Sequence, residues 1–165
     1  MRKCRWHNLF SNLPTIAANI RATAKMTDPH NLQRFIGAQD PDYAEVLAEL
    51  AVGQKTSHWM WFVFPQHKEL GRSAMAQRYG IASKEDAQAY CQHPVLGARL
   101  RECVELVLAV KGKTAFQILG TPDDLKFRSS MTLFSQAEPD EPLFQRALAK
   151  YFGGIGDSRT LELLA

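Results

Sequence analysis

Beyond residue 27, the chain is a succession of short apolar stripes at helical spacing, each set between a start signal and a stop signal. Asp28-Pro29 and Asp40-Pro41 each place a carboxylate before a proline, a combination that favours the first turn of a helix. No segment alternates apolar and polar residues over more than about five positions, so the pattern does not indicate a sheet. The sequence therefore predicts a mainly α fold, with about seven or eight short helices in a single compact domain over residues 28–165.

The same signals indicate where individual helices begin and end. They predict helices that start at Asp28-Pro29, Asp40-Pro41, Gly71, Ser83, Pro94, Thr114, Thr121-Pro122, Pro142 and Ser158. The expected stops are Gly53, Gly80, Gly112 and Gly153-Gly154. In the helix after Pro122, the residues expected to face the core are Leu125, Phe127, Met131 and Phe134.

The segment from His58 to Phe64 fits neither periodicity, because large or apolar residues occupy both of its faces. A segment of this kind is normally buried on every side, so we expect either a short strand around residues 58–64 or an inner helix. Trp59 and Trp61 suit the centre of a core. The functional alternative is that one of these tryptophans lines a pocket and stacks on a flat ligand ring.

Composition excludes several classes of protein. The 165 residues, with a mass of 18.6 kDa, are enough for one domain and a tail. No apolar run reaches the roughly 18 residues that span a bilayer, so we do not expect an integral membrane protein. Three cysteines are too few for a disulfide framework and lack the spacing of metal ligands. We therefore expect a cytoplasmic protein without a metal or another cofactor.

Charge is distributed unevenly along the chain. Residues 1–25 hold five basic residues and no acidic one, and the rest of the chain is slightly acidic. We expect residues 1–27 to form a disordered basic tail, which is either the product of an upstream start codon or a targeting segment. Because the excess positive charge belongs to this tail, the charge of the chain does not predict a nucleic-acid partner.

A locally basic region surrounds the aromatic segment. Its polar residues are Lys55, His58, Gln66, His67, Lys68, Arg72 and Arg78. Gly71-Arg72-Ser73 lies where a helix should begin, so free backbone N–H groups, a guanidinium and a hydroxyl would meet there. Such a set of groups binds phosphate or carboxylate. The plainer interpretation is a solvated basic face on which Ser73 is an ordinary helix cap.

A second polar group lies in the C-terminal half of the chain. Asp123 and Asp124 fall in the expected first turn of a helix, where they complement its dipole, and Asp124 is spaced to pair with Arg128. These contacts with the helix dipole and with Arg128 are enough to account for both carboxylates without a functional role. The functional alternative takes Asp123, Lys126 and Ser130 as one helical stripe, in which a carboxylate acts as a base or accepts a bond from a ribose hydroxyl. None of the familiar catalytic motifs occurs in the sequence.

Four blocks of sequence carry a resemblance to a known family. They are His58-Trp59-Met60-Trp61-Phe62-Val63-Phe64-Pro65-Gln66, Leu70-Gly71-Arg72-Ser73, His93-Pro94-Val95-Leu96-Gly97 and Asp123-Asp124-Leu125-Lys126-Phe127-Arg128-Ser129-Ser130-Met131. Over residues 28–164 the chain resembles the domain-of-unknown-function 1810 family, some of whose members carry a calpastatin label. This resemblance implies a mainly helical domain with no settled activity. More distantly, the chain is similar to the NADAR superfamily, whose members act on ADP-ribose linkages and related N-glycosides, which implies a nucleotide-like ligand.

Two hypotheses follow. In the first, the chain binds or processes a phosphorylated nucleotide or an ADP-ribose-like small molecule. The ligand-binding residues would then be Lys55, His58, Trp59, Trp61, Gln66, Arg72, Ser73, Lys126 and Ser130, and the catalytic residues would be Asp123 and Asp124. In the second, the chain is a non-catalytic helical module that contacts another protein, and its polar strings are caps, ion pairs and a contact face.

Overall fold

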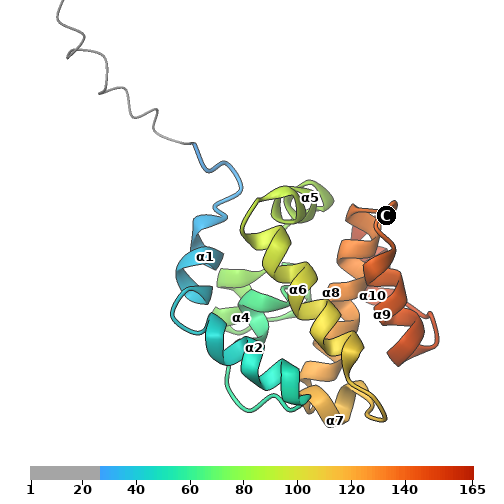
Figure 1. The fold of residues 1–165 in the computed structure, drawn as a ribbon. Coiled ribbons are helices and arrows are strands. Elements are labelled where there is room, and N and C mark those ends of the chain that lie inside the picture. The colour runs from blue at the N-terminus through green and yellow to red at the C-terminus, as the bar shows by residue number, and fades with distance from the viewer. Residues whose placement is uncertain (1–26) are drawn as a thin grey trace, which may run out of the picture.

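The structure is a computed structural model that describes residues 27–165. Within that range the chain forms ten α-helices and one 3-10 helix (Figure 1). The elements are α1 (Gln33–Gln39), α2 (Tyr43–Val52), α3 (Met60–Val63), η1 (Lys68–Leu70), α4 (Ala74–Tyr79), α5 (Lys84–Gln92), α6 (Leu96–Ala109), α7 (Ala115–Leu119), α8 (Asp123–Ala137), α9 (Pro142–Phe152) and α10 (Ser158–Leu164). The mainly α fold is confirmed. The predicted basic tail lies, except for its last residue, outside the described residues.

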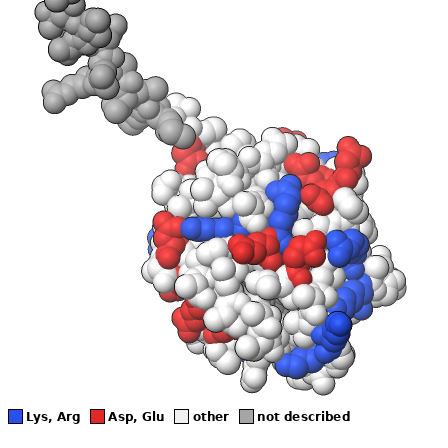
Figure 2. All heavy atoms as spheres, viewed as in Figure 1, with Lys and Arg blue, Asp and Glu red and all other residues white. Residues whose placement is uncertain are grey.

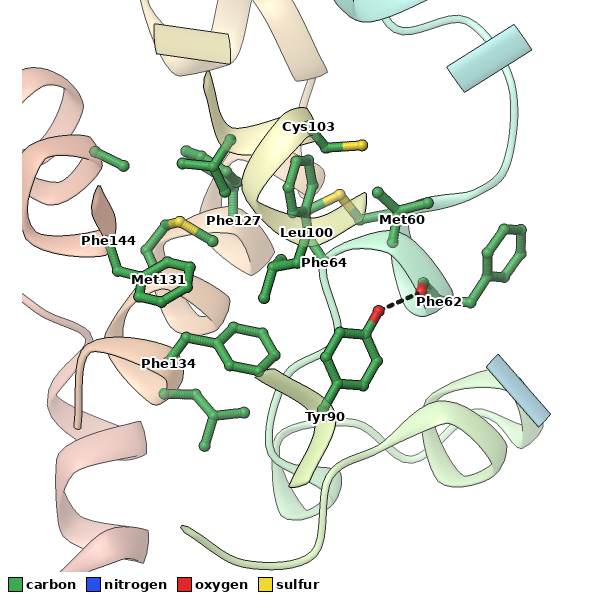
Figure 3. Close-up of a cluster of buried hydrophobic side chains, with 14 of the residues drawn as sticks. Met60, Phe62, Phe64, Tyr90, Leu100, Cys103, Phe127, Met131, Phe134 and Phe144 are labelled. Carbon is green, nitrogen blue, oxygen red and sulfur yellow. Dashed lines mark hydrogen bonds between the residues drawn. The ribbon is translucent and has the colours of Figure 1, made fainter. Parts of the chain in front are cut away.

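The segment around residues 58–64 forms one turn of helix, α3, so the alternative of a short strand is wrong. This turn and other very short helices bring the total to ten in the described residues, above the seven or eight expected. The Phe62 carbonyl accepts a hydrogen bond from the Gln39 side chain at 2.7 Å. It also accepts one from the Tyr90 hydroxyl at 3.2 Å (Figure 3). The N–H groups of Phe62, Val63 and Phe64 donate to carbonyls within the same turn, so this buried segment needs no partner strand.

Local signals mark several helix ends as predicted. The Asp28 carboxylate accepts hydrogen bonds from the N–H groups of Leu32 and Gln33, at 2.7 and 2.8 Å, but α1 begins at Gln33 and not at the predicted Asp28-Pro29. Ser83 caps α5, and Thr114 and Gln117 form a capping box at the start of α7. Gly153 ends α9 in the left-handed region, with φ of 62°.

Other local expectations are wrong as well. Asp40 follows the last residue of α1 and does not cap α2, which begins at Tyr43 without a side-chain cap. Helix α6 ends at Ala109, before the expected stop at Gly112, and the Lys150 ammonium group binds the carbonyls of Leu108 and Val110 at this end. The cap of α10 is Asp157, whose carboxylate accepts from the Thr160 N–H at 2.8 Å, and not Ser158. Leu125 is 56% exposed. It lies two residues before a buried phenylalanine, which places it about 200° around the helix, on the opposite face.

Helix α8 lies inside the fold and packs against α5, α7, α9 and α10 (Figure 1). Phe127, Met131 and Phe134 on this helix are fully buried, as predicted. In Figure 3 they meet aromatic side chains from other elements, with ring centroids 4.9 Å apart for Phe64 and Phe127 and 5.6 Å apart for Phe134 and Phe144. These contacts hold α8, and with it the position of its first turn, against the rest of the domain.

The surface carries charges of both signs. On the face shown in Figure 2, acidic and basic side chains lie beside one another. Ion pairs such as Arg99–Asp40 at 2.8 Å and Arg146–Glu105 at 3.1 Å join neighbouring elements. Within residues 27–165, no helix has the length and apolar character needed to cross a bilayer.

Candidate functional site

One buried carboxylate holds the loop of residues 54–59, which joins α2 to α3. Glu49, near the end of α2, is 7% exposed. Its side chain accepts hydrogen bonds from the Thr56 N–H at 3.0 Å, the Thr56 hydroxyl, the Ser57 N–H at 2.9 Å and the Trp59 indole N–H at 2.7 Å. The 54–59 loop is therefore fixed to α2 at three successive points.

These hydrogen bonds decide the charge state of Glu49. Burial by itself raises the pKa of this carboxyl, because it disfavours the charged form. The bonds from Thr56, Trp59 and Ser57 outweigh burial and lower the pKa from 4.5 to about 2. Glu49 is thus ionised at neutral pH, which makes each of these hydrogen bonds charge-assisted.

Lys55 extends from the 54–59 loop to the start of α8. Its backbone N–H donates to the Ile118 carbonyl at 2.7 Å, which joins the loop to α7. Its ammonium group donates to the Ser57 carbonyl at 2.6 Å and lies 2.8 Å from Oδ2 of Asp123. The side chain of Lys55 is only 7% exposed. The Ser57 carbonyl and the Asp123 carboxylate offset the cost of burying the Lys55 ammonium group, because an unpaired charge is costly to remove from water.

Asp123 joins Lys55 to a second lysine. Asp123 is the first residue of α8, and its Oδ1 lies 2.8 Å from Nζ of Lys126, one turn further along the helix. We call Lys55, Asp123 and Lys126 the lysine–aspartate cluster. Burial raises the pKa of Asp123, but the hydrogen bonds from Lys126 and Lys55 lower it by more, so the pKa lies below its usual 3.8. The three side chains together carry one net positive charge.

Each lysine of the cluster lies over an indole ring. Nζ of Lys55 is 5.0 Å from the ring centroid of Trp59, and Nζ of Lys126 is 4.8 Å from that of Trp61. At such distances the face of an indole attracts a cation. Trp59 is 1% exposed and belongs to the core, whereas Trp61 is half-buried. Of these two tryptophans, Trp61 is therefore the one that a ligand can reach.

A small cavity lies beside Trp61 and Lys126. Its volume is about 10 Å³, close to the space that one water molecule needs. The lining residues are Met60, Trp61, Phe64, Gln66, Ala76, Tyr79, Gly80 and Lys126. Gln66 brings an amide, which both donates and accepts hydrogen bonds, to this cavity. A ligand larger than water would have to lie across the mouth of the cavity and not inside it.

The predicted anion site around Arg72 lies at the surface of the domain. Arg72 and Ser73 are exposed on the segment between η1 and α4, and neither lines the cavity. The Ser73 hydroxyl accepts from the Ala76 N–H at 3.1 Å, so Ser73 is an ordinary cap of α4, as the plainer interpretation predicted. His58, at the other predicted flank, is exposed as well. Among the described residues, none of these three makes a hydrogen bond or an ion pair with the lysine–aspartate cluster.

Only part of the predicted stripe on α8 reaches the surface. Asp123, Lys126 and Ser130 are spaced at i, i+3 and i+7, so they lie on one face of this continuous helix. Ser130, about two turns from Asp123, is fully buried, and its hydroxyl has no hydrogen-bond partner among the described residues. It therefore makes no hydrogen bond with the lysine–aspartate cluster. The predicted ion pair between Asp124 and Arg128 is absent from the described residues, because Arg128 donates instead to two carbonyls of the α9–α10 loop, both at 3.0 Å. One oxygen of Asp124 is left buried without a partner in this part of the chain.

Sequence reasoning missed Glu49. The apolar stripe of α2 predicts that Val46 and Leu50 are buried, and both are. Glu49 follows Val46 by three residues, so it lies on the same stripe. A charged residue inside an apolar stripe was the available signal, but its four hydrogen-bond donors belong to a loop whose path the pattern of α2 does not predict.

Metal and thiol chemistry find little support in residues 27–165. No group of three or more histidine, cysteine, aspartate or glutamate side chains in that range is placed to hold a metal ion. Cys91 and Cys103 are buried, and burial raises the pKa of both thiols to about 12. They are therefore neutral at physiological pH and poor nucleophiles.

The described residues thus form an all-helical domain in which two lysines and an aspartate meet beside two tryptophans. The chain belongs to the family described as Protein of unknown function (DUF1810), whose model matches residues 29–164. The predicted family resemblance is confirmed.

A solved structure supports the same grouping. The conserved hypothetical protein Rv1873 from Mycobacterium tuberculosis, known from a crystal structure, is 55% identical to this chain, with a TM-score of 0.82. The alignment covers 83% of this chain and 98% of that one. Comparison with curated proteins gives no match. These findings add neither a NADAR relation nor a calpastatin label.

Proposed function

We propose that the protein binds a small molecule with a phosphate or pyrophosphate group, of the phosphorylated-nucleotide or ADP-ribose kind, at the lysine–aspartate cluster. The observation that carries this proposal is the convergence of two ammonium groups, from distant parts of the chain, beside a half-buried tryptophan. Lys55 and Lys126 bind the phosphate oxygens, and Trp61 stacks on the base.

The geometry of the two lysines suits a bridging oxyanion. Both Nζ atoms lie 2.8 Å from oxygens of a single carboxylate. Two oxygens of a phosphate group are spaced closely enough to bridge the same ammonium groups with charge-assisted hydrogen bonds. Lys55 is already held by the Ser57 carbonyl and the anchored 54–59 loop. Little side-chain entropy is therefore left to lose when a ligand binds.

The remainder of the ligand would lie at the surface, because the cavity beside the cluster is close to the size of a water molecule. The half-buried ring of Trp61 supplies a stacking face, and stacking of a base on an aromatic side chain is worth about 1–3 kcal/mol. The amide of Gln66 supplies a hydrogen bond.

The cluster favours binding over proton transfer. Both oxygens of Asp123 are occupied by lysines, and the carboxyl is ionised because its pKa lies below 3.8. An ionised carboxylate cannot act as a general acid, and one of such low pKa is a weak general base near neutral pH. The proposal is therefore a binding function, and the catalytic roles predicted for Asp123 and Asp124 are not part of it.

Isothermal titration calorimetry with ADP-ribose and AMP tests the proposal. Wild-type protein should bind at least one of them. Lys126→Ala removes one charge-assisted hydrogen bond, worth about 1.5–3 kcal/mol, and should weaken binding about tenfold to a hundredfold. The matched control is Lys111→Ala, which removes an exposed lysine beyond α6 and should leave the Kd unchanged. Arg72→Ala should also have little effect.

Two results would contradict the proposal. Equal affinities for Lys126→Ala and Lys111→Ala would show that the ligand binds elsewhere. No binding by the wild-type protein across a panel of phosphorylated metabolites would favour the alternative of a helical module that contacts another protein.

A further inference from the structure

Asp123 fills the position that a bridging phosphate would need. Its Oδ2 lies 2.8 Å from Lys55 and its Oδ1 lies 2.8 Å from Lys126, so each carboxylate oxygen takes one ammonium group. The carboxylate of Asp123 therefore occupies the position between the two ammonium groups.

Asp123 is part of the chain and is always present between the two lysines, so a ligand must displace its carboxylate in order to bind. Asp123 is the first residue of α8, and the contacts of Phe127 in the core hold that helix in place. The Asp123 side chain itself is 17% exposed, so it can turn towards solvent while the backbone stays. A ligand with one negative charge gains no electrostatic advantage over the carboxylate that it displaces, whereas a ligand with two charges does.

An ion pair that only joined the 54–59 loop to α8 would not need two lysines. One lysine is sufficient to neutralise one carboxylate, and Lys55 already does so with its side chain almost fully buried. Lys126 adds a second cation that is 23% exposed and lines the cavity beside Trp61. The cluster is thus left with an excess positive charge on the side that solvent can reach.

We propose that Asp123 is an internal counter-ion that occupies the anion position of the lysine–aspartate cluster and restricts it to dianionic phosphate groups, namely phosphate monoesters and pyrophosphates. This inference rests on the proposed function and adds a charge requirement for the ligand. Singly charged anions, including phosphodiesters, are excluded because they cannot compete with the carboxylate.

Calorimetry on Asp123→Asn tests the role of the carboxylate. Asparagine keeps the size of the side chain and one acceptor oxygen but removes the charge. The variant should bind AMP at least about tenfold more tightly than wild type, and it should bind cyclic AMP, a monoanionic phosphodiester. Asp40→Asn is the matched control, because it removes the same charge from an exposed ion pair with Arg99. It should leave both affinities near the wild-type values.

A second arm uses the wild-type protein and does not depend on the folding of any variant. At pH 8, AMP carries two charges on its phosphate, because the second pKa of a phosphate monoester is about 6. Wild-type protein should bind AMP at least about tenfold more tightly than cyclic AMP. Equal binding of the two nucleotides would overturn the inference.

The outcomes separate the inference from the proposed function. If wild type binds AMP and Asp123→Asn binds it no more tightly than Asp40→Asn does, the counter-ion role is wrong and the binding function stands. If neither wild type nor Asp123→Asn binds any phosphate compound, the proposed function is wrong and the inference falls with it. Binding of AMP by Asp123→Asn alone would overturn both, because the wild-type site would then exclude dianionic phosphates as well.

Discussion

Replacing Glu49 with glutamine should release the 54–59 loop and lower the free energy of unfolding. Glutamine has nearly the same shape as glutamate but carries no charge, and one of its two terminal atoms is a donor. In the wild-type protein this side chain faces four donors, from Thr56, Ser57 and Trp59. The amide nitrogen of glutamine would meet one of these donors, so at least one hydrogen bond is lost and the others weaken.

The lowered pKa of Glu49 sets the size of the effect. A fall from 4.5 to about 2 corresponds to roughly 3 kcal/mol of preferential stabilisation of the ionised form in the folded state. We expect Glu49→Gln to lower the free energy of unfolding by about 2–3 kcal/mol at pH 7. Hydrogen bonds to a charged group are each worth about 1.5–3 kcal/mol, and some donors of the loop can form hydrogen bonds with water instead.

The pH dependence has a definite sign. The folded-state pKa is depressed, so this stabilisation is complete above about pH 4.5 and is lost as the pH falls towards about 2. Linkage with these two pKa values leaves about 1.5 kcal/mol at pH 3. The difference in stability between wild type and Glu49→Gln should therefore shrink by about half between pH 7 and pH 3.

Urea unfolding followed by circular dichroism at both pH values measures these differences. The control is Glu45→Gln, an exposed position on the same helix, which should change stability by less than about 0.5 kcal/mol at pH 7. A Glu49→Gln effect that is as small as the control, or that is the same at pH 3 as at pH 7, would refute the reasoning.

Three further predictions concern the core. Gly97→Ala should destabilise the protein by about 3 kcal/mol or more, because the new Cβ would lie 1.9 Å from the Cys91 carbonyl oxygen; an unchanged melting temperature would contradict this. Phe127→Ala should cost about 3–5 kcal/mol in urea unfolding, because it removes a fully buried ring; a loss below about 1 kcal/mol would show that the site collapses. In a chain that carries Cys4→Ser, a thiol reagent should label Cys91 and Cys103 only after urea is added, because both thiols are buried with a pKa of about 12; rapid labelling of the folded chain, detected by mass spectrometry, would contradict it.

The helical class and many helix ends followed from short stretches of sequence. Ser83, Thr114 and Gly153 act within about four residues of their own positions, so their roles as caps or stops do not depend on the rest of the fold. One exception involves a long-range contact. The Lys150 ammonium group binds the carbonyls of Leu108 and Val110 at the C-terminal end of α6, and no spacing within α6 predicts that contact.

The candidate site was only partly predictable. Lys55, Asp123 and Lys126 stood out as residue types suited to anion chemistry, but Arg72 stood out for the same reason and, in the described residues, shares no ion pair with them. Glu49, which anchors the loop that carries Lys55, did not stand out at all. The polar groups of a short sequence block can face any direction until the packing of their neighbours is known.

Short-range information, therefore, was enough to establish a helical domain and the chemical character of its polar strings, because caps, prolines, glycines and apolar stripes act within a few residues. The meeting of Lys55 with Asp123 depends instead on how the 54–59 loop packs on α7 and α8, across a long stretch of chain. The same packing buries Trp59 and leaves Trp61 within reach. Burial against distant elements determines which neighbouring side chain reaches solvent, and no local rule contains that information.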